Sequence, residues 1–490
     1  KVEGEKPASI ISHSDIVKSE VITSKGLQKA ACCNLAESFV TNASVDVEYT
    51  DAVSGARQIQ LLGLHGAYSQ ILVENIPNLR GIASRYGLGY IPGPWMESIS
   101  ISKGTASVVN GFESISGQMK KPETSLPFYG NAFVDDMGRV EASVDGAYNL
   151  NEKTSTMLLL HSNMLQNPVD MNHDSFIDHP LVKQFNTINR WTYHGEIHES
   201  VTGANVLFES RNGGQNAFVT NKNPENYGFD VNTERVQIFT KNGFIIPTEM
   251  HQSICTIISG TYHNQNSFYG KNTYKANQNS LYVNLIYQAE FNEDNNLTTG
   301  LSYQYDHYDE NYKTLQYETV ESIPGIFAEY GYNGIKDLTL VGGLRVDNHN
   351  NYGTFVTPRF HLKYSIDDVT TMRLSAGKGF RSAIVLAENA GIMASSRDFI
   401  ISPNLKLEEA TNYGLNFITQ FDFWGIYYTL NIDFYRTDFI NQVVVDLDKN
   451  PNAAYFYNLD GKSYSNAFQV DFIIEPIVGM TITTAYRLND

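Results

Sequence analysis

The sequence predicts a transmembrane antiparallel β-barrel preceded by a smaller α+β domain. First, charged residues make up only 18% of the 490 residues, below the roughly 25% of typical soluble domains. Second, aromatic residues reach 12%, with 30 tyrosines and 26 phenylalanines, as in barrels whose aromatic girdles mark both membrane interfaces. Third, strand-length segments alternate apolar and polar residues, and no apolar run approaches the roughly 20 residues of a membrane helix.

Composition and charge exclude several other classes of protein. A hydrophobic fraction of 42% is too high for a disordered chain. The formal net charge of −18 argues against a nucleic-acid partner, because phosphate recognition requires basic surfaces. Three cysteines, two of them adjacent, do not form a disulfide framework.

The α+β domain is predicted over residues 1–122. Apolar residues at helical spacing predict a short helix over residues 27–39. Short buried strands are predicted over residues 58–62, 70–73 and 96–101, separated by connections rich in glycine and proline.

The barrel is predicted over residues 123–490. Within residues 426–435, for example, Leu430, Ile432 and Phe434 share one face, while Asn431 and Asp433 share the other. Alternation also fits a soluble β-sandwich. Two features favour a membrane barrel: the segments run to about ten residues, and short turns such as 151–153 alternate with long polar loops such as 166–183 and 382–404. About 19 candidate strands can be counted between residues 129 and 488.

Several motifs give the chain a recognisable resemblance. In the first domain they are QIQLLGL (58–64), ILVENIP (71–77), MESISISKG (96–104), VVNG (108–111) and ISGQ (115–118); in the barrel they are TPR (357–359), GFR (379–381) and NLKLEEATNY (404–413). In this order and spacing the chain resembles the plug and barrel of TonB-dependent outer-membrane receptors. It departs from the family pattern at Leu62, where many members have arginine, and at Glu74 and Asn75, where they have Asp-Gly. The family's usual ion pair from that arginine to the barrel is therefore not carried over to this chain.

The resemblance implies a 22-stranded barrel in a Gram-negative outer membrane, with the plug seated in its lumen. It implies a monomer, surrounded by outer-membrane lipid, that is not an enzyme and requires no cofactor. The TonB–ExbB–ExbD complex of the inner membrane would move the plug and so drive active import. The small ligand would be a scarce metal chelate: a siderophore, haem, cobalamin or a copper complex. The alternatives are an oligosaccharide or peptide import receptor with a surface lipoprotein partner, and a passive porin.

Substrate-binding residues are expected in the plug, on the loop formed by residues 78–91. Arg80 and Arg85 offer positive charge, and Tyr86 and Tyr90 offer rings for a flat or anionic ligand. Asp51 belongs to a second expected apex, residues 51–54. The alternative is that the two arginines pair with barrel carboxylates such as those of Glu408 or Glu409.

A loop in the barrel carries oxygen ligands at alternate positions, as calcium sites do. They are Asp170, Asn172, Asp174 and Asp178. The match to an EF-hand fails at Ser175, which stands for glycine, and at Leu181, which stands for glutamate. The loop therefore predicts either a calcium site completed by other groups or a solvated acidic loop. His173 and His179 could instead attract a transition metal.

The adjacent Cys32 and Cys33 suggest capture of a soft metal such as Cu(I) or zinc. Alternatives are a strained disulfide between neighbours or two small residues packing a helix. Cys255 is expected to be inert. The sequence has no GxSxG, HExxH or P-loop motif that would indicate catalysis.

The strand count leads to one further expectation. About 19 candidate strands fall short of the 22 that the resemblance implies, and the chain ends at Asp490 without the expected terminal aromatic residue. We therefore expect C-terminal closing strands to be missing from these 490 residues, because unpaired strand edges are unfavourable in lipid.

Overall fold

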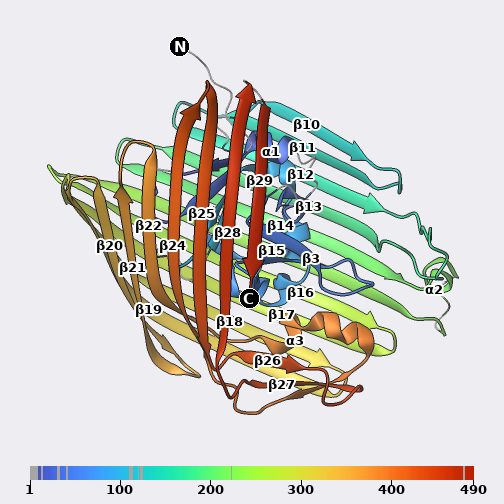
Figure 1. Ribbon diagram of the computed structural model, residues 1–490. Coiled ribbons are helices and arrows are strands. Elements are labelled where there is room, and N and C mark those ends of the chain that lie inside the picture. Colours follow the sequence, from blue (N-terminus) through green and yellow to red (C-terminus); the bar gives the residue numbers. More distant parts are fainter. Residues whose placement is uncertain are drawn as a thin grey trace.

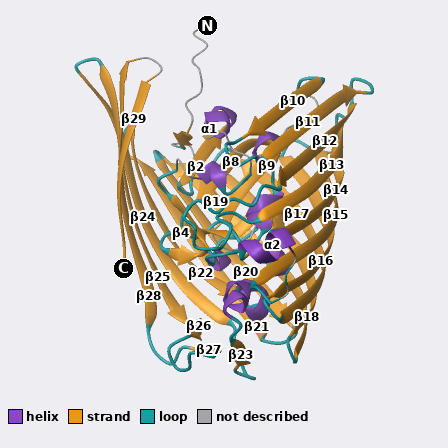
Figure 2. Ribbon diagram, turned by 90° about the vertical axis from the view of Figure 1, so that its right-hand side faces the viewer, coloured by secondary structure: helices purple, strands orange, loops and turns teal. Residues whose placement is uncertain are grey.

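The computed structural model places a large curved sheet around a smaller group of strands and short helices (Figures 1 and 2). It describes residues 9–12, 15–29, 34–39, 42–109, 114–119, 121, 125–221, 223, 225–477 and 480–490. No helix within these ranges has both the length and the apolar character needed to cross a membrane. The curved sheet is the barrel wall, and the enclosed elements are the plug.

The wall is one antiparallel sheet of 17 strands, in which each strand pairs with the next wall strand along the chain. Three short strands that fall between wall strands in the sequence lie outside this sheet. Its strands are β10 (Phe128–Val134), β11 (Val140–Asn149), β12 (Thr154–Leu165), β13 (Leu181–His194), β14 (His198–Gly214), β15 (Gly228–Pro247), β16 (His251–Tyr269), β17 (Asn272–Asn292), β18 (Asn295–Tyr312), β19 (Leu315–Ile335), β20 (Leu338–His349), β21 (Gly353–Ser365), β22 (Thr370–Arg381), β24 (Glu408–Phe423), β25 (Ile426–Ile440), β28 (Ser463–Ile477) and β29 (Met480–Asn489). Among the described residues, the outermost strands β10 and β29 are not paired with each other.

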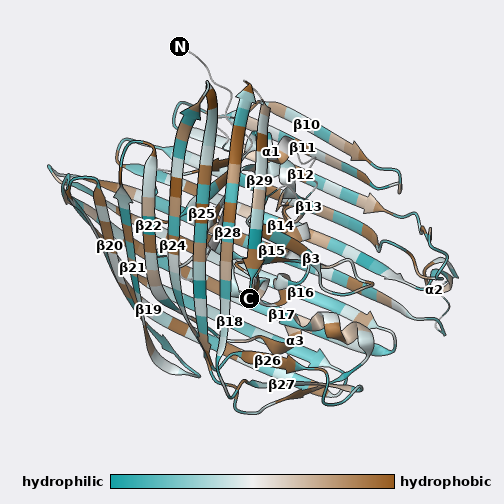
Figure 3. Cartoon of the chain, viewed as in Figure 1, coloured by the Kyte–Doolittle hydropathy of each residue, from teal (hydrophilic) through white to brown (hydrophobic). Residues whose placement is uncertain are grey.

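Side chains along the wall follow the predicted alternation, with the polar face turned inward. In β25, Asn431 and Asp433 are buried at 0% and 1% exposure, whereas Phe434 is 42% exposed. In β15, Arg235 is buried and its neighbour Val236 is exposed. Figure 3 shows the resulting bands of polar and apolar colour along the strands. A polar interior with an apolar exterior is the arrangement of a transmembrane barrel and the reverse of a soluble sandwich.

The plug contains two sheets. A six-stranded sheet has the order β1-β2-β8-β9-β6-β7, with β6 and β9 parallel, and a three-stranded sheet has the order β3-β4-β5. The bounds are β1 (Ser9–Ile11), β2 (Ser19–Thr23), β3 (Val45–Tyr49), β4 (Arg57–Leu61), β5 (Leu64–His65), β6 (Gln70–Val73), β7 (Ile76–Asn78), β8 (Met96–Ser102) and β9 (Ser114–Met119). The predicted strands at 58–62, 70–73 and 96–101 correspond to β4, β6 and β8. Ile59, Leu61, Ile99 and Ile101 from these strands are fully buried in the plug core.

The continuous helix predicted over residues 27–39 is wrong. Helix α1 covers Ser24–Lys29, and a separate 3₁₀ turn, η1, covers Glu37–Phe39. Between them, Asn34 forms a bridge with Pro92, and its side-chain oxygen accepts a hydrogen bond from the backbone N–H of Glu37. Asparagine favours such capping over a helix interior, so a new turn starts there.

The predicted alternation of short turns with long loops holds in part: the long loops all lie at one end of the wall, but short turns such as 270–271 and 313–314 lie at that end too. The turn predicted at 151–153 joins β11 to β12, and residues 424–425 join β24 to β25. The long loops contain α2 (Asn216–Asn221), α3 (Val385–Glu388) and η7 (Ala390–Ser395). They also contain β23 (Asp398–Ile401), β26 (Val443–Asp446) and β27 (Ala453–Asn458), which form a separate small sheet. Figure 1 shows α3, β26 and β27 at the end away from the N-terminus.

Plug and wall make close contact behind β8. Gly104 has φ +78°, and a Cβ at this position would lie 2.8 Å from the ring of Tyr435. Glycine is therefore required here both for the backbone conformation and for the approach to the wall. The preceding Lys103 reaches Asp433 in β25 at 2.8 Å. The motif at residues 96–104 thus places the buried cation of Lys103 against the barrel wall.

Candidate functional site

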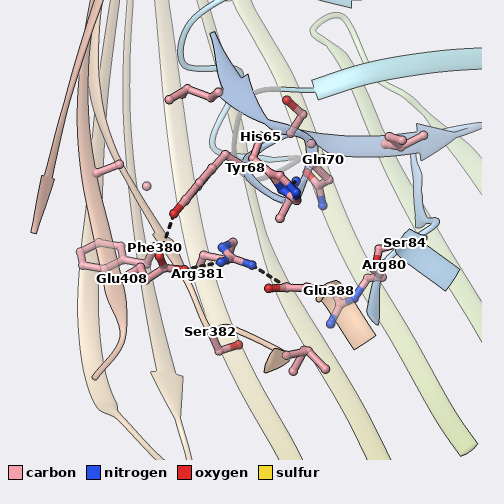
Figure 4. A pocket seen from close by; sticks show the side chains of 18 of the residues that line it. His65, Tyr68, Gln70, Arg80, Ser84, Phe380, Arg381, Ser382, Glu388 and Glu408 are labelled. Atoms are coloured by element: carbon pink, nitrogen blue, oxygen red, sulfur yellow. Dashed lines mark hydrogen bonds and ion pairs between the residues drawn. The ribbon is translucent and has the colours of Figure 1, made fainter. Parts of the chain in front are cut away.

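A cavity of about 330 Å³ lies between the plug and the wall. Its plug side comes from the 3₁₀ turns η2 (Gly66–Tyr68) and η3 (Gly81–Ser84) and the residues around them. Its wall side comes from β17 to β22, β24 and β25, with α3 at its edge. This volume is within the range of sites for small ligands. Figure 4 shows part of the lining.

Arg381, at the end of β22, is the centre of an ion-pair cluster in this cavity (Figure 4). Its guanidinium pairs with Glu388 of α3 and with Glu408 at the start of β24. Tyr68 of the plug donates its hydroxyl to Glu408 Oε1 at 2.8 Å, and the guanidinium of Arg381 lies 4.9 Å from the Tyr68 ring centre. Gln442 in turn donates to the Tyr68 hydroxyl at 3.1 Å. One arginine therefore connects the plug, the wall and a long loop.

Burial shifts the acidity of two members of this cluster. Burial raises the pKa of the Glu388 carboxyl, and the nearby Arg381 charge offsets only part of that effect. Burial and the Glu408 carboxylate raise the pKa of the Tyr68 hydroxyl well above its ordinary value. Tyr68 therefore stays protonated and acts as a hydrogen-bond donor throughout the physiological pH range.

The segment that carries α3, η7 and β23 covers the cavity from the long-loop end; we call residues 382–401 the lid. Val385, Leu386 and Met393 of the lid are completely buried, and α3 contacts η3 of the plug. The parallel pairing of β23 with β27 joins the lid to the loop after β25. The two loops are thus hydrogen-bonded into one body.

The predicted apical residues Arg85 and Asp51 are brought together. Arg85 Nη2 lies 2.6 Å from Asp51 Oδ2 and 3.0 Å from the Ser54 hydroxyl. The Arg85 guanidinium also stacks against Tyr86 and against Tyr269 of the wall, at 5.1 and 5.3 Å from the ring centres. Both expected apices of the plug therefore meet in one buried ion pair.

Arg80 pairs with a wall carboxylate, that of Asp306 in β18, rather than with Glu408 or Glu409. Arg80 and Arg85 both line the cavity. Tyr86 and Tyr90 are buried at 3% and 4% exposure, outside its lining. Ligand binding by these residues and by Asp51 stays a prediction.

The ion pair of Asp51 predicts a dependence on pH. Burial alone would raise the pKa of Asp51, but Arg85 and hydrogen bonds from Ser54 lower it below the ordinary 3.8. A carboxyl group whose pKa is lowered by folding stabilises the folded state at pH values above its pKa in the unfolded chain. This stabilisation is lost as the pH falls through the pKa of the folded state. We compare the amide exchange rates of residues 51–57 with the intrinsic rates at the same pH. We expect this ratio to be unchanged between pH 7 and 5 and to rise at least about tenfold near pH 3. Asp51→Asn should abolish the difference; acceleration that persists in this variant would refute the assignment.

The predicted calcium loop folds back on itself. Asp170 accepts from the backbone N–H of Ser175 at 3.1 Å, and Asp178 accepts from that of Met171 at 2.8 Å. Ser175 has φ +77°, the conformation that glycine supplies in EF-hand loops. Yet no group of three or more His, Cys, Asp or Glu side chains placed to hold a metal is found in the described part of the chain. Calcium at Asp170, Asn172, Asp174 and Asp178 stays a prediction.

Of the three cysteines, Cys255 lies half-buried in β16 as a free thiol. Cys32 and Cys33 lie outside the described residues, so the soft-metal prediction is untested.

The Arg381 cluster was not predicted from the sequence. The sequence indicates Glu408 only as a possible partner of Arg80 or Arg85, and it singles out neither Tyr68 nor Glu388. A signal was present, since the motifs GFR (379–381) and NLKLEEATNY (404–413) contain Arg381 and Glu408.

The fold and the enclosed plug define the class of a plugged outer-membrane β-barrel. The model of the TonB-dependent receptor β-barrel matches residues 129–472, and that of the TonB-dependent receptor plug domain matches residues 14–118. The chain belongs to the TonB-dependent receptor family and is an integral protein of the outer membrane. No curated protein matches the chain.

Solved structures show the same fold at low identity. The siderophore receptor PirA from Pseudomonas aeruginosa has a TM-score of 0.72 at 14% identity, over 99% of this chain and 86% of that one. The alcaligin receptor FauA from Bordetella pertussis has a TM-score of 0.72 at 13% identity, over 97% and 81%. The copper transporter OprC has a TM-score of 0.76 at 12% identity, over 99% and 81%.

Proposed function

We propose that this receptor imports a scarce metal chelate by active transport across the outer membrane. The observation that carries the proposal is the cavity between plug and wall, because it lies where a ligand would touch both bodies at once. Its size suits a small chelate. The proteins of the same fold named above are a siderophore receptor, an alcaligin receptor and a copper transporter.

Energy would reach the cavity through the N-terminal part of the plug. Arg373 of β22 donates to the backbone oxygens of Ser12 and Asp15, at 2.8 and 3.0 Å. A pull by the TonB–ExbB–ExbD complex on the segment preceding residue 9 would act first on these contacts. Lys103 lies further along the plug, and its ion pair with Asp433 of the wall would resist movement of the plug.

The alternatives receive less support. A passive porin requires an open lumen, whereas here the plug lies inside the wall (Figure 2). A receptor for an oligosaccharide or a peptide would have a larger cavity lined by pairs of aromatic rings. The lining contains the ring pairs Phe355–Phe380 and Tyr68–Phe439, but a volume of about 330 Å³ does not favour so large a ligand.

Growth of a deletion strain tests the proposal directly. We expect slower growth than the parent under limitation for one of iron, copper or cobalamin, with rescue by the intact gene but not by a variant lacking the plug. Unchanged growth under all three limitations would contradict the import of a metal chelate. A constitutively open pore in liposomes containing the intact protein would favour the porin instead.

A further inference from the structure

A carboxyl group is completely buried beneath the lid, and it belongs to none of the ion pairs described above. It is that of Glu310, which is 0% exposed and lies two residues before the end of β18. Tyr274 of β17 donates its hydroxyl to Glu310 Oε1 at 2.6 Å, whereas Glu310 Oε2 has no hydrogen-bond partner within the described structure. Because buried carboxylates are normally paired or hydrogen-bonded, the exception at Glu310 requires a physical explanation.

Glu310 lies beyond the part of β18 that crosses the membrane. The side chains of β18 that face outward change along the strand from Leu301 and Tyr305 to the exposed Asp309. Carboxylates are unfavourable on a lipid-facing surface, and aromatic side chains mark the edge of that surface. The outer membrane therefore ends between Tyr305 and Asp309, and Glu310 lies inside the wall at the long-loop end.

The same end of β18 holds the lid. Tyr312 donates its hydroxyl to the backbone oxygen of Arg397 at 3.1 Å, and the ring centres of Tyr312 and Phe399 are 5.1 Å apart. Lys313, directly after the strand, donates to the backbone oxygen of Ser396 at 2.7 Å. Movement of the lid would therefore uncover this end of the strand.

The groups around Glu310 disfavour its charged form. The titratable and charged groups that face it are Tyr274 of β17, Tyr317 of β19, Glu388 of α3 and Asp309 of β18 itself. Both charged groups among them are carboxylates, which oppose ionisation of a third. Burial has the largest effect and raises the pKa of Glu310 to about 7, although hydrogen bonding to Tyr274 and to the backbone N–H of Ala387 in α3 opposes this shift.

We propose that a proton on Glu310 holds the lid closed: the neutral carboxyl allows α3 to pack over it, and loss of the proton favours opening. A buried carboxylate without a cation is costly, and an open lid would relieve that cost by admitting water. The inference goes beyond the proposed function, since it concerns the lid alone and holds whichever ligand the cavity takes.

The direction of the pH dependence follows from the two states of the lid. With the lid closed the pKa of Glu310 is about 7, and with the lid open water would return it toward the ordinary 4.5. The closed state therefore binds the proton more tightly, and the resulting stabilisation is lost as the pH rises through the pKa of the closed state. The equilibrium for opening is then expected to rise about tenfold from pH 6 to pH 8 and to level off at higher pH.

Hydrogen exchange of the lid measures this equilibrium in the full-length protein in detergent. The amide exchange rates of residues 385–395 are compared with the intrinsic rates at the same pH, which removes the base catalysis of exchange itself. We expect this ratio to rise about tenfold between pH 6 and pH 8 in the wild type. Glu310→Gln keeps the volume of the side chain and cannot ionise, so its ratio should stay constant and, at pH 8, lie below that of the wild type.

Two further variants distinguish this effect from structural damage. Glu318→Gln removes a carboxylate of β19 that is 71% exposed, and it should show the pH dependence of the wild type. Tyr274→Phe removes a hydroxyl that stabilises the Glu310 carboxylate. Its ratio should therefore rise by more than about tenfold between pH 6 and pH 8 and continue to rise above pH 8, where the wild type levels off. Damage would instead raise the ratio by the same factor at every pH.

Two results would overturn the proposal. One is a ratio that does not change between pH 6 and pH 8 in the wild type. The other is the same rise in Glu310→Gln as in the wild type, because a different group would then carry the pH dependence, such as Glu388 or the pair of Glu321 with His349. Heat-dependent gel mobility verifies that the variants fold. If Glu310→Gln does not fold, a wild-type profile for Tyr274→Phe would refute the proposal instead.

Discussion

Replacement of Lys103 by methionine is expected to weaken the seating of the plug in the barrel by about 3–5 kcal/mol, the usual cost of leaving one charge of a buried pair without its partner. Lys103 Nζ lies 2.8 Å from Asp433 Oδ2 and donates to Gln469 at 2.9 Å. Both charged side chains are 1% exposed. Methionine keeps the length of the side chain and removes its charge.

A second lysine does not replace the lost partner. Lys18 Nζ lies 3.9 Å from the same carboxylate oxygen, beyond hydrogen-bond distance. Burial lowers the pKa of Lys18, although Asp433 opposes this shift. Burial thus disfavours the charged form of Lys18, and its distance from Asp433 precludes a hydrogen bond, so Lys18 would compensate only in part.

The measurement is the urea concentration at which the plug opens a pore in a planar bilayer. For Lys103→Met we expect a lower midpoint than for the wild type, and for Lys336→Met, whose side chain is 91% exposed, an unchanged one. The double variant Lys103→Met, Asp433→Leu should recover only part of the loss, because it removes the uncompensated carboxylate but also takes from Lys18 the carboxylate with which it pairs. Equal midpoints for the two single lysine variants would show that this pair does not anchor the plug.

The wall was predictable because its determinants are local. A period of two, with polar side chains inward and apolar side chains outward, is visible within any ten residues, as between Leu430 and Phe434. The number of strands was less accessible. The count of about 19 compares with 17 strands in the wall and three short strands beside it. The alternation of apolar and polar residues continues beyond the part of each strand that crosses the membrane, and β17 and β19 each reach 21 residues. A single long strand of this kind can be counted as two candidate strands in the sequence.

The candidate site was much less predictable, because its contacts join residues far apart in the chain. Tyr68 and Glu408 are separated by 340 positions, and Arg80 and Asp306 by 226. Such pairs depend on how the plug sits against the wall, which no local pattern specifies. Even within the plug, Arg85 meets Asp51 across 34 positions. The sequence suggested a barrel carboxylate as a possible partner for Arg80 or Arg85, but it indicated neither Asp306 nor Asp51 as the actual partner.

Replacement of Arg381 by alanine is expected to release the lid and to expose the cavity from the long-loop end. Glu388 and Glu408 would lose the cation that they share. A buried charge without its partner costs several kcal/mol. A change of about 1.4 kcal/mol already corresponds to a tenfold change in the equilibrium for opening of the lid. Tyr68 would also lose the guanidinium that stacks on its ring.

Chemical labelling measures this opening. Ser84 of η3 lines the cavity beneath the lid, so Ser84→Cys introduces a reporter thiol once Cys32, Cys33 and Cys255 are changed to serine. We expect a membrane-impermeant maleimide to label this thiol at least tenfold faster in whole cells carrying Arg381→Ala. Glu388→Gln, which keeps the volume and removes one charge, should give an intermediate rate.

The control variant removes a different contact of the same lid. Lys313 pairs with Asp398 at 2.6 Å, but their side chains are 24% and 70% exposed, and exposed pairs contribute at most about 1 kcal/mol. Lys313→Met should therefore change the labelling rate by less than about fivefold. Similar rates for Arg381→Ala and Lys313→Met would mean that packing of Val385, Leu386 and Met393 holds the lid without help from the ion pairs. A fast rate only for Arg381→Ala would assign the closure to the one arginine that touches plug, wall and lid together.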